Sequence, residues 1–247
     1  MNADASPLYA PLFGHSPETH ARVAAVFGLV MLVGGTFANW ASTRLLVRDD
    51  LATTASNLVA NESLLRYSIL GSLAMMVAWV FYALFLYRLL RPVDGRPALT
   101  MLALVVTSVP IYMLNQTNLF AALPLAKAGQ LEQLGVSLEI FRFGNSVATI
   151  FFALWLLPLG VLVLRSTFLP KVLGVLLLLG TPGYLIHFAQ ALLFPSAAPS
   201  LWGNPFLVVT HLSELALLLW LLVRGVHPGR WAERARTGTA SSAAAAA

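Results

Sequence analysis

Long stretches without a charged residue alternate with short charged segments along this chain. Five such stretches hold 21, 21, 30, 22 and 42 residues, at 23–43, 67–87, 97–126, 143–164 and 172–213. A helix needs about 20 apolar residues to cross the roughly 30 Å of hydrocarbon in a bilayer. Each stretch is therefore long enough to span a membrane, and none shows the sustained alternation typical of a half-buried strand.

The last stretch is too long for one span and contains a cluster of turn-forming residues, namely Pro195, Pro199, Gly203 and Pro205. This cluster divides it into two helices joined by a short loop. The pattern therefore predicts an all-α, polytopic integral membrane protein with six transmembrane helices, at about 22–42, 64–90, 98–123, 139–164, 171–194 and 204–224. The predicted transmembrane domain covers 21–226, between a polar N-terminal segment (1–20) and a basic, then Ala-rich tail (227–247). We expect that tail to be disordered or an ill-defined helix.

Composition supports a location in the lipid bilayer. Of the 247 residues, 58% are hydrophobic and only 10% are charged, and the mean hydropathy is +0.79. A soluble domain carries about 25% charged residues. The net charge is +5, but the 15 basic residues are scattered between apolar segments, so no nucleic-acid partner is expected. Cysteine is absent from the sequence, which excludes disulfides, thiolate metal sites and cysteine nucleophiles.

The basic residues are divided unequally between the two sides of the predicted bundle. An even number of spans places both termini on one side, and that side receives ten of the 15 basic residues. Because cytoplasmic segments carry an excess of Lys and Arg, we expect both termini in the cytoplasm and the protein in the plasma (inner) membrane. The first 20 residues lack a basic n-region, so we expect the first span to act as an uncleaved anchor.

Four segments of the chain are distinctive: NESLLRYSIL, LYRLLRPVDGRPAL, IFFALWLLPLGVLVLRSTFLPKVLGVLLLLGTPGYLI and ELALLLWLLVRG. Together they resemble a bacterial family of multi-pass membrane proteins catalogued as domain of unknown function 4386. The resemblance runs from roughly residue 20 to 226, and its most specific part is RSTFLPKVLG followed by GTPGYL. It implies a multi-pass fold and no particular activity.

Polar side chains inside the spans are the candidates for function, because they are costly in hydrocarbon and tend to face the interior of a bundle. At about 1.5 Å per residue, Glu214 lies roughly 15 Å and His211 roughly 10 Å below the outer surface. The other candidates also fall in the outer half: His187, Gln190, Asn115, Asn118, Arg142, Asn145 and Glu139. The inner halves offer only Ser, Thr and Gly. This one-sided layer predicts a polar pocket that opens to the outside.

Helical spacing sorts these residues into groups. His211 and Glu214 pair at i, i+3, as do Asn115 and Asn118, whereas two triplets recur every three residues: Glu139, Arg142 and Asn145, and Tyr184, His187 and Gln190. Each group also has a structural interpretation, since interfacial charges snorkel and pair, and asparagines join helices by hydrogen bonds. Pro110, Pro158 and Pro182 each remove a backbone hydrogen bond inside these spans.

Three functions from different classes fit this pattern. The first is a pocket that binds or modifies an amphiphilic, lipid-like molecule, with Glu214 and His211 handling a proton and the other polar residues binding the ligand. The second is a proton-coupled small-molecule transporter that uses Glu214. The third is a non-catalytic membrane subunit that binds a partner. No metal or cofactor is predicted; weaker alternatives are a metal at His187, His211 and Glu214 and a haem at the two histidines. Oligomeric state stays open.

Overall fold

The computed structural model describes residues 16–194 and 204–244, and within these ranges all regular structure is helical. The helices are α1 (Pro17–Leu45), α2 (Leu51–Ala60), α3 (Glu62–Leu90), α4 (Gly95–Lys127), α5 (Leu131–Leu154), α6 (Leu156–Arg165), α7 (Lys171–Leu193), α8 (Pro205–Val223) and α9 (Pro228–Ala244). Most of the polar N-terminal segment and the turn residues Pro195, Pro199 and Gly203 lie outside the described residues.

Six helical segments are long and apolar enough to cross a membrane. They are α1, α3, α4, the combined α5–α6 segment, α7 and α8. The predicted all-α architecture with six spans is therefore confirmed. The largest difference is in the fourth span, which begins at Leu131 rather than near 139. Glu132 and Glu139 on this extension are exposed, so the helix continues past the apolar stretch with its charged side chains turned outward. The extension packs beside the end of α4 and against α2.

The fourth span has a local irregularity where α5 meets α6. Pro158 has no N–H to donate to the carbonyl of Leu154, and the regular α-helix is interrupted for one residue at Trp155, whose backbone angles stay helical. Trp155 is only 2% exposed and packs edge-to-face on Trp79, with 5.5 Å between ring centroids. The irregular turn therefore lies inside the bundle. Pro110 and Pro182 are accommodated within the continuous helices α4 and α7.

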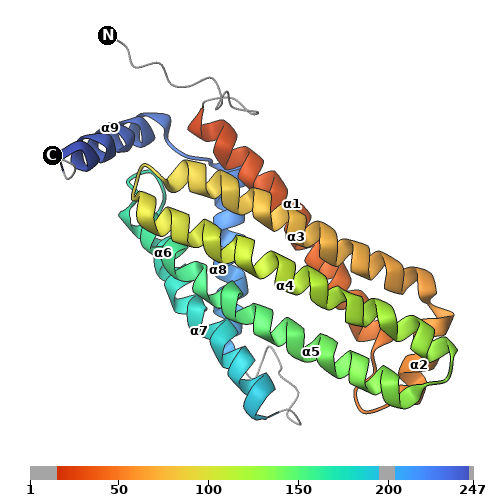
Figure 1. Cartoon of the computed structure of the whole chain (residues 1–247). Helices are drawn as coiled ribbons and strands as arrows, with labels where there is room; N and C mark the ends of the chain where they lie inside the picture. Colours follow the sequence, from red (N-terminus) through yellow and green to blue (C-terminus); the bar gives the residue numbers. More distant parts are fainter. Residues whose placement is uncertain (1–15, 195–203, 245–247) are drawn as a thin grey trace.

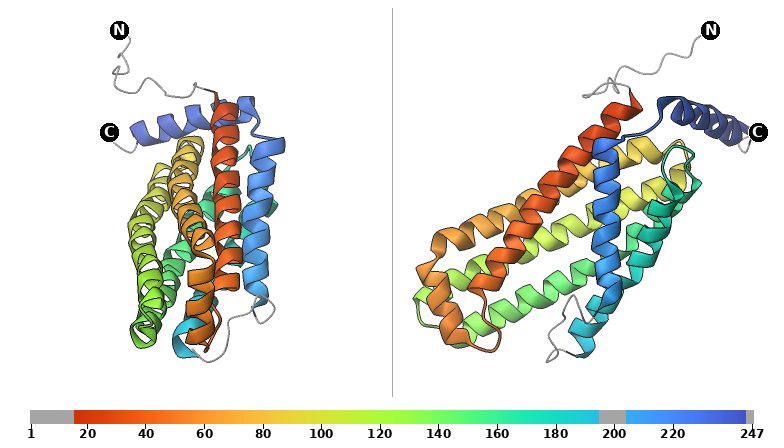
Figure 2. Two further views of the ribbon diagram at one scale, coloured as in Figure 1. Left: turned by 90° about the vertical axis from the view of Figure 1, so that its right-hand side faces the viewer. Right: turned by 180° about the vertical axis from the view of Figure 1, so that it is seen from behind.

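The helices pack mainly in chain order. Contacts pair α1 with α3, α3 with α4, α4 with α5 and α7 with α8, while α7 also packs against α5 and α6, and α8 against α1 (Figure 1). Both described ends of the chain lie at one end of the bundle, where α9 runs across the turns at 91–94 and 166–170 (Figure 2). We call this the termini end, and we call the opposite end, which carries α2 and the turn at 128–130, the α2 end.

Short helices occupy both ends of the bundle. The 43–63 segment, the longest predicted loop apart from the termini, contains α2, whose N-cap Asp50 accepts a hydrogen bond from the backbone N–H of Thr53 at 2.9 Å. Of the two forms expected for the tail, the structure has a helix, α9. Trp231 anchors it by donating from Nε1 to the carbonyl of Leu89 at 2.9 Å, and Arg234 donates to the carbonyl of Val93 at 3.3 Å.

Candidate functional site

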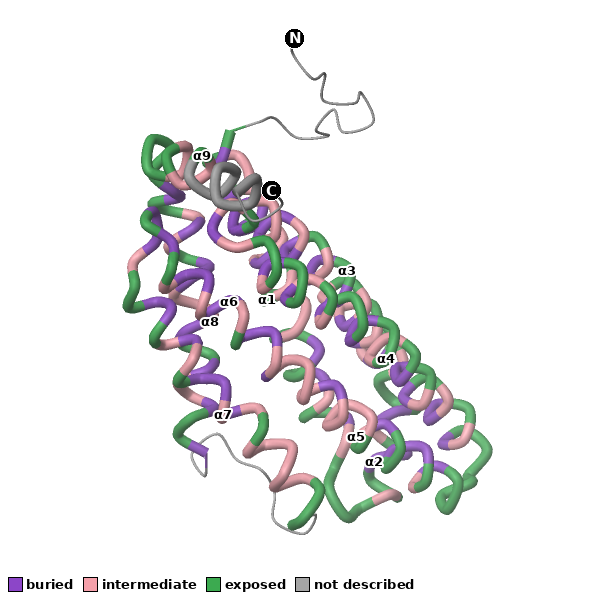
Figure 3. Tube along the Cα trace, turned by 60° about the vertical axis from the view of Figure 1, so that its left-hand side comes forward, coloured by how far each residue is buried: buried purple, intermediate pink, exposed green. Residues whose placement is uncertain are grey.

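Buried positions follow the sides of the long helices that face one another (Figure 3), and they form two hydrophobic clusters along the bundle. The larger cluster lies toward the termini end and includes Trp79 and Trp155, and the smaller lies toward the α2 end and includes Leu58 and Leu134. Between them along α3, α4 and α5 lie buried or half-buried polar side chains: Ser68, Ser72, Asn115, Gln116, Asn118, Asn145, Ser146 and Thr149. Polar side chains therefore separate two apolar regions, and three of the candidates from the sequence, Asn115, Asn118 and Asn145, are among them.

The contact between α4 and α5 holds the asparagines. Asn115 Nδ2 donates to the carbonyl of Phe141 at 2.8 Å and to Asn145 Oδ1 at 2.9 Å. Its own Oδ1 accepts from Asn118 Nδ2 at 3.1 Å, and Ser137 donates to the carbonyl of Asn118 at 2.7 Å. These side chains form hydrogen bonds within and between the two helices, so they support helix packing. We call them the amide cluster.

Gly144 explains why Asn115 reaches so far onto α5. A Cβ atom at residue 144 would lie 2.3 Å from Asn115 Oδ1 and 2.5 Å from its Cγ, well inside van der Waals contact. The missing side chain therefore makes the space in which the Asn115 amide lies against α5. Asn115 is 8% exposed, so its hydrogen bonds are shielded from the surroundings.

The contact between α7 and α8 holds a carboxylate. Glu214 is the tenth residue of the 19-residue helix α8, and the Tyr184 hydroxyl of α7 donates to its Oε2 at 2.9 Å. Among the described residues Glu214 forms no ion pair with a basic side chain. An ionised carboxylate at the middle of a span is costly unless its charge is compensated. Glu214 is therefore suited to hold a proton or to bind a positively charged group.

His211 lies beside this pair but contacts it differently from the sequence-based expectation. Its Nδ1 is 2.7 Å from the carbonyl oxygen of Leu207, and a carbonyl only accepts, so the neutral ring carries its proton on Nδ1. Its ring packs edge-on against Tyr184 with 5.8 Å between centroids. Helical spacing paired Glu214 with His211; the structure provides the Tyr184 hydroxyl as its hydrogen-bond partner instead. Tyr184 shares the predicted helix face of His187 and Gln190, which was the available signal.

Two glycines on α7 bring Tyr184 close to α8. A Cβ atom at residue 183 would lie 2.2 Å from Thr210 Oγ1 and 2.6 Å from the carbonyl oxygen of Phe206, and one at residue 180 would lie 2.8 Å from Thr210 Cα. Thr210 donates its hydroxyl to the carbonyl of Gly180, and Asn204 Nδ2 donates to that of Gly183 at 2.9 Å. Small residues allow this close approach, and hydrogen bonds then fix it.

Aromatic rings surround the carboxylate contact on the side of the bundle core. Phe152 of α5 lies 6.0 Å from Tyr184, 4.8 Å from Trp79 and 6.1 Å from Tyr112, measured between ring centroids. Aromatic residues had been assigned to core and lipid contact. The rings do build the core, and Phe152 also connects Tyr184 to it. The indole nitrogen of Trp79 is buried without a hydrogen-bond partner among the described residues.

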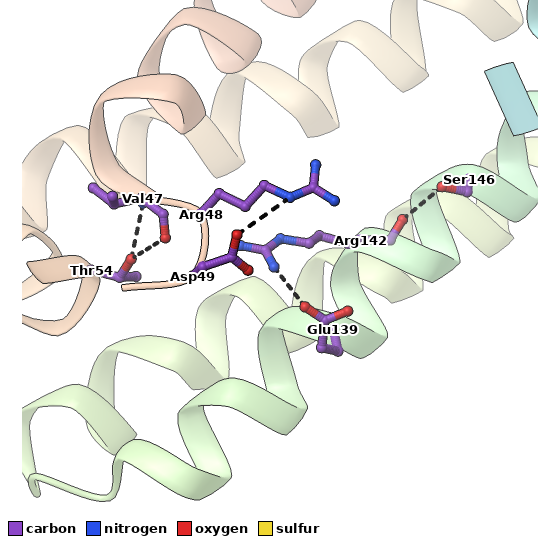
Figure 4. Close-up of polar contacts among 7 residues, drawn as sticks. All are labelled: Val47, Arg48, Asp49, Thr54, Glu139, Arg142 and Ser146. Carbon is purple, nitrogen blue, oxygen red and sulfur yellow. Dashed lines mark hydrogen bonds and ion pairs between the residues drawn. The ribbon is translucent and has the colours of Figure 1, made fainter. Parts of the chain in front are cut away.

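The charged candidates on α5 lie elsewhere. Arg142 pairs with Glu139 at 2.6 Å, and its side chain points from α5 toward the turn that carries Arg48 and Asp49 (Figure 4). Arg142 precedes Phe152 by ten residues, a separation of about 15 Å along a helix. Its carbonyl accepts from Ser146 at 3.1 Å. This pair therefore belongs to the α2 end, as interfacial charges do.

The remaining candidates on α7 lie on the same side as Tyr184. His187 and Gln190 are half-buried, and His187 is near enough to His211 for their charges to interact. Across the described residues, no hydrogen bond joins the amide cluster to Glu214. In that same part of the chain no three His, Asp or Glu side chains are grouped to hold a metal ion. The haem alternative stays a prediction from the sequence.

Comparisons with known proteins identify a family and no activity. The family model described as "Domain of unknown function (DUF4386)" matches residues 12–225. An "Uncharacterized protein" of Archaeoglobus fulgidus is 28% identical over 159 residues, which is 64% of this chain and 84% of that protein. No solved structure matches. Since the family model covers most of the chain, this multi-pass membrane protein belongs to the DUF4386 family.

Proposed function

We propose that the protein binds an amphiphilic, lipid-like molecule inside the membrane, with the polar head of that molecule at Glu214, Tyr184 and His211. The observation that carries this proposal is the mid-span carboxylate, which has a tyrosine hydroxyl as its partner and forms no ion pair with a basic side chain in the described part of the chain. A carboxylate kept at such a position is by default a functional group rather than a packing element.

The three side chains differ in what they offer a ligand. Glu214 exchanges a proton or accepts a hydrogen bond, and Tyr184 holds its Oε2 in place. His211 is exposed, and with Nδ1 engaged at Leu207 its Nε2 is a lone-pair acceptor. His187 and Gln190, half-buried on the same side of α7, extend the polar lining. The apolar part of the ligand would lie along exposed Leu185 and Leu212.

The amide cluster and the Arg142–Glu139 pair have other roles in this proposal. Asn115, Asn118 and Asn145 bond to one another, so we assign them to the packing of α4 on α5. Arg142 and Glu139 lie toward the α2 end, where a ligand that enters from that end would pass them. The binding site proper is thus on α7 and α8.

Analysis of the lipids that remain bound after purification tests this function. We expect mass spectrometry to find one amphiphile enriched over its share of the membrane. Glu214→Gln and Tyr184→Phe should reduce that enrichment about tenfold, because a hydrogen bond to a charged group is worth about 1.5–3 kcal/mol. Glu132→Gln, which changes an exposed carboxylate on α5, is the matched control. Equal lipid content in all four proteins would reject the proposal and leave a non-catalytic subunit as the alternative.

A second function is favoured by the proline-induced irregularity in the fourth span. Proline-interrupted helices beside a mid-membrane polar group occur in secondary transporters, and here the irregular turn at Trp155 lies three residues from Phe152, which contacts Tyr184. A proton-coupled transporter would use Glu214 as its proton carrier. Proteoliposomes that contain a pH-sensitive dye and receive the copurified amphiphile distinguish the two functions. Proton movement that Glu214→Gln abolishes supports transport, and its absence, with binding retained, supports a binding or modifying protein.

The same proposal places the termini end in the cytoplasm, in the plasma membrane. Among the described residues that end carries ten basic side chains against Glu18, Asp94 and Glu233, whereas the α2 end carries five basic and five acidic ones. Positive charge accumulates on the cytoplasmic side. Because the chain has no cysteine, a single cysteine at Gly95 should resist an impermeant thiol reagent in intact cells, and one at Ala128 should react. The reverse pattern would invert the orientation.

A further inference from the structure

A hollow of about 690 Å³ lies at the termini end, far from the Glu214 contact. Its lining comes from the end of α6, the turn into α7 and the first part of α9, with the polar residues Arg165, Ser166, Thr167, Lys171, Arg230 and Glu233. Three of these side chains are positive and one is negative. The hollow therefore carries a local excess of positive charge where two spans reach the membrane surface.

Hydrogen bonds hold the Arg165 side chain and the helix that carries Arg230. Arg165 donates from Nη1 to Asp94 Oδ2 at 3.1 Å, and Asp94 Oδ1 in turn accepts from the backbone N–H of Arg96 at the start of α4. Arg230 is presented by α9, whose position is set by the hydrogen bonds of Trp231 and Arg234 to the turn after α3. The hollow thus lies between the end of α6 and the anchored helix α9, and its charged side chains are exposed.

The start of α7 adds to the positive potential of the hollow. Lys171 is the first residue of this 23-residue helix, and the residue before it, Pro170, provides no side-chain cap for the first turn. The unpaired N–H groups and the helix dipole at such an end favour a negative group nearby. The hydroxyl of Ser166 donates to the carbonyl of Val163, and Arg165 donates to Asp94. The donors that remain for a ligand are therefore mainly Lys171 and Arg230.

We propose that this hollow binds a phosphate group presented at the membrane surface. The guanidinium and ammonium groups line the hollow from two sides, from the α6–α7 turn and from α9. Such groups match a tetrahedral anion with several acceptor oxygens. In the proposed orientation the hollow, at the ends of α6 and α7, would lie at the level of the lipid headgroups, with α9 along its aqueous side. An anionic phospholipid headgroup and a free phosphate compound share this chemistry, and both are included in the test.

Native mass spectrometry of the whole protein in detergent provides the test. The protein is titrated with phosphatidylglycerol, with phosphatidylcholine and with inorganic phosphate, and the double variant Lys171→Gln/Arg230→Gln is compared with the wild type. We expect the double variant to lose binding about tenfold or more, since it removes two of the three positive charges that line the hollow. Arg236→Gln removes an exposed charge from α9 outside the hollow and is the matched control.

Each outcome has a defined meaning. Preferential binding of phosphatidylglycerol, weakened in the double variant and unchanged in Arg236→Gln, supports a lipid headgroup site. Binding of inorganic phosphate with the same dependence supports a soluble phosphate ligand. Equal binding of all probes by the wild type and the double variant overturns the proposal, as does an equal loss in Arg236→Gln, which would indicate general surface charge. Glu214→Gln should leave these results unchanged, so this site and the proposed function fail independently.

Discussion

The α4–α5 and α7–α8 contacts both place polar side chains within membrane-spanning helices, but they leave those side chains in different states. In the amide cluster Asn115 both donates and accepts, and its partners come from the two helices that it joins. At α7–α8 the carboxylate of Glu214 receives one hydroxyl and forms no ion pair among the described residues. The Asn115 amide, with its donor and acceptor atoms both engaged, stabilises the helix contact, whereas the carboxylate of Glu214 retains its capacity to react or to bind.

Glycine is used differently in the two contacts. At α4–α5 the space above Gly144 is filled by the end of the Asn115 side chain, which is able to rotate away. At α7–α8 the space above Gly183 is bounded by the backbone oxygen of Phe206. The second contact therefore tolerates less change, and its helix spacing determines where Tyr184 meets Glu214.

The largest expected effect follows from that difference. Gly183→Ala should lower the free energy of unfolding by about 3 kcal/mol, because the new methyl group forces α7 away from α8. Unfolding in detergent measures this loss. Gly95→Ala is the control, since nothing lies within 4 Å of its added Cβ. If Gly144→Ala proves more destabilising than Gly183→Ala, the assignment of the tighter contact to α7–α8 is wrong.

Removal of the central amide should have the next largest effect. Asn115→Leu eliminates three hydrogen bonds and leaves Asn145 and the Phe141 carbonyl without this partner. Interhelical hydrogen bonds in membranes are worth about 0.6 kcal/mol on average and up to about 1.7, so we expect a loss of about 2 kcal/mol. Amphiphile binding per folded molecule should stay at the wild-type level. A selective loss of binding would move the amide cluster into the site.

Changes at Glu214 should reverse that pattern, with little effect on stability and a large effect on function. Glu214→Gln keeps the shape and the hydrogen bond, so the free energy of unfolding should change by less than about 1 kcal/mol. Glu214→Leu should also fold, because replacing a buried charge by an apolar side chain is often neutral or stabilising. Binding measurements beside unfolding measurements check this. If both variants unfold easily while binding per folded molecule is normal, Glu214 is a structural tie.

The smallest effect concerns the N-cap of α2, the helix that packs against α4 and α5 at the α2 end. The hydrogen bonds from the side chain and the backbone N–H of Thr53 lower the pKa of Asp50 from its ordinary value of 3.8. A lowered pKa means that the stabilisation is complete above pH 3.8 and is lost as the pH falls through the lower, folded-state pKa.

Asp50→Ala should therefore melt slightly below the wild type at pH 7, and the difference should shrink below pH 3.8. Hydrogen exchange locates the effect: we expect faster exchange in α2 and in the adjacent end of α5, with α7 and α8 unchanged. Faster exchange at α8 would show that the two contacts are coupled and would weaken the comparison on which these predictions rest.

Much of the architecture was accessible from the chain alone. The six spans were predictable because a helix of about 20 apolar residues crosses the hydrocarbon and forms its backbone hydrogen bonds internally. This holds whatever the neighbouring helices are. The polar layer was visible for the same reason, since each polar residue is conspicuous in an apolar stretch. The irregular turn at Trp155 followed from Pro158, a local backbone effect. Only the ends of the helices differed, where charged side chains on α5 extend beyond the bilayer-length segment.

The partners of the polar side chains depended on the tertiary structure. Spacing placed His211 and Glu214 on one face of a helix, but His211 turns its Nδ1 to Leu207 and Glu214 receives a hydroxyl from the neighbouring helix. Which side chains meet across two helices depends on the rotation and distance of their axes. Those are set by close packing at Gly180, Gly183 and Thr210, residues without charge or conspicuous chemistry. Local spacing determines which residues share a face, and only packing determines what that face meets.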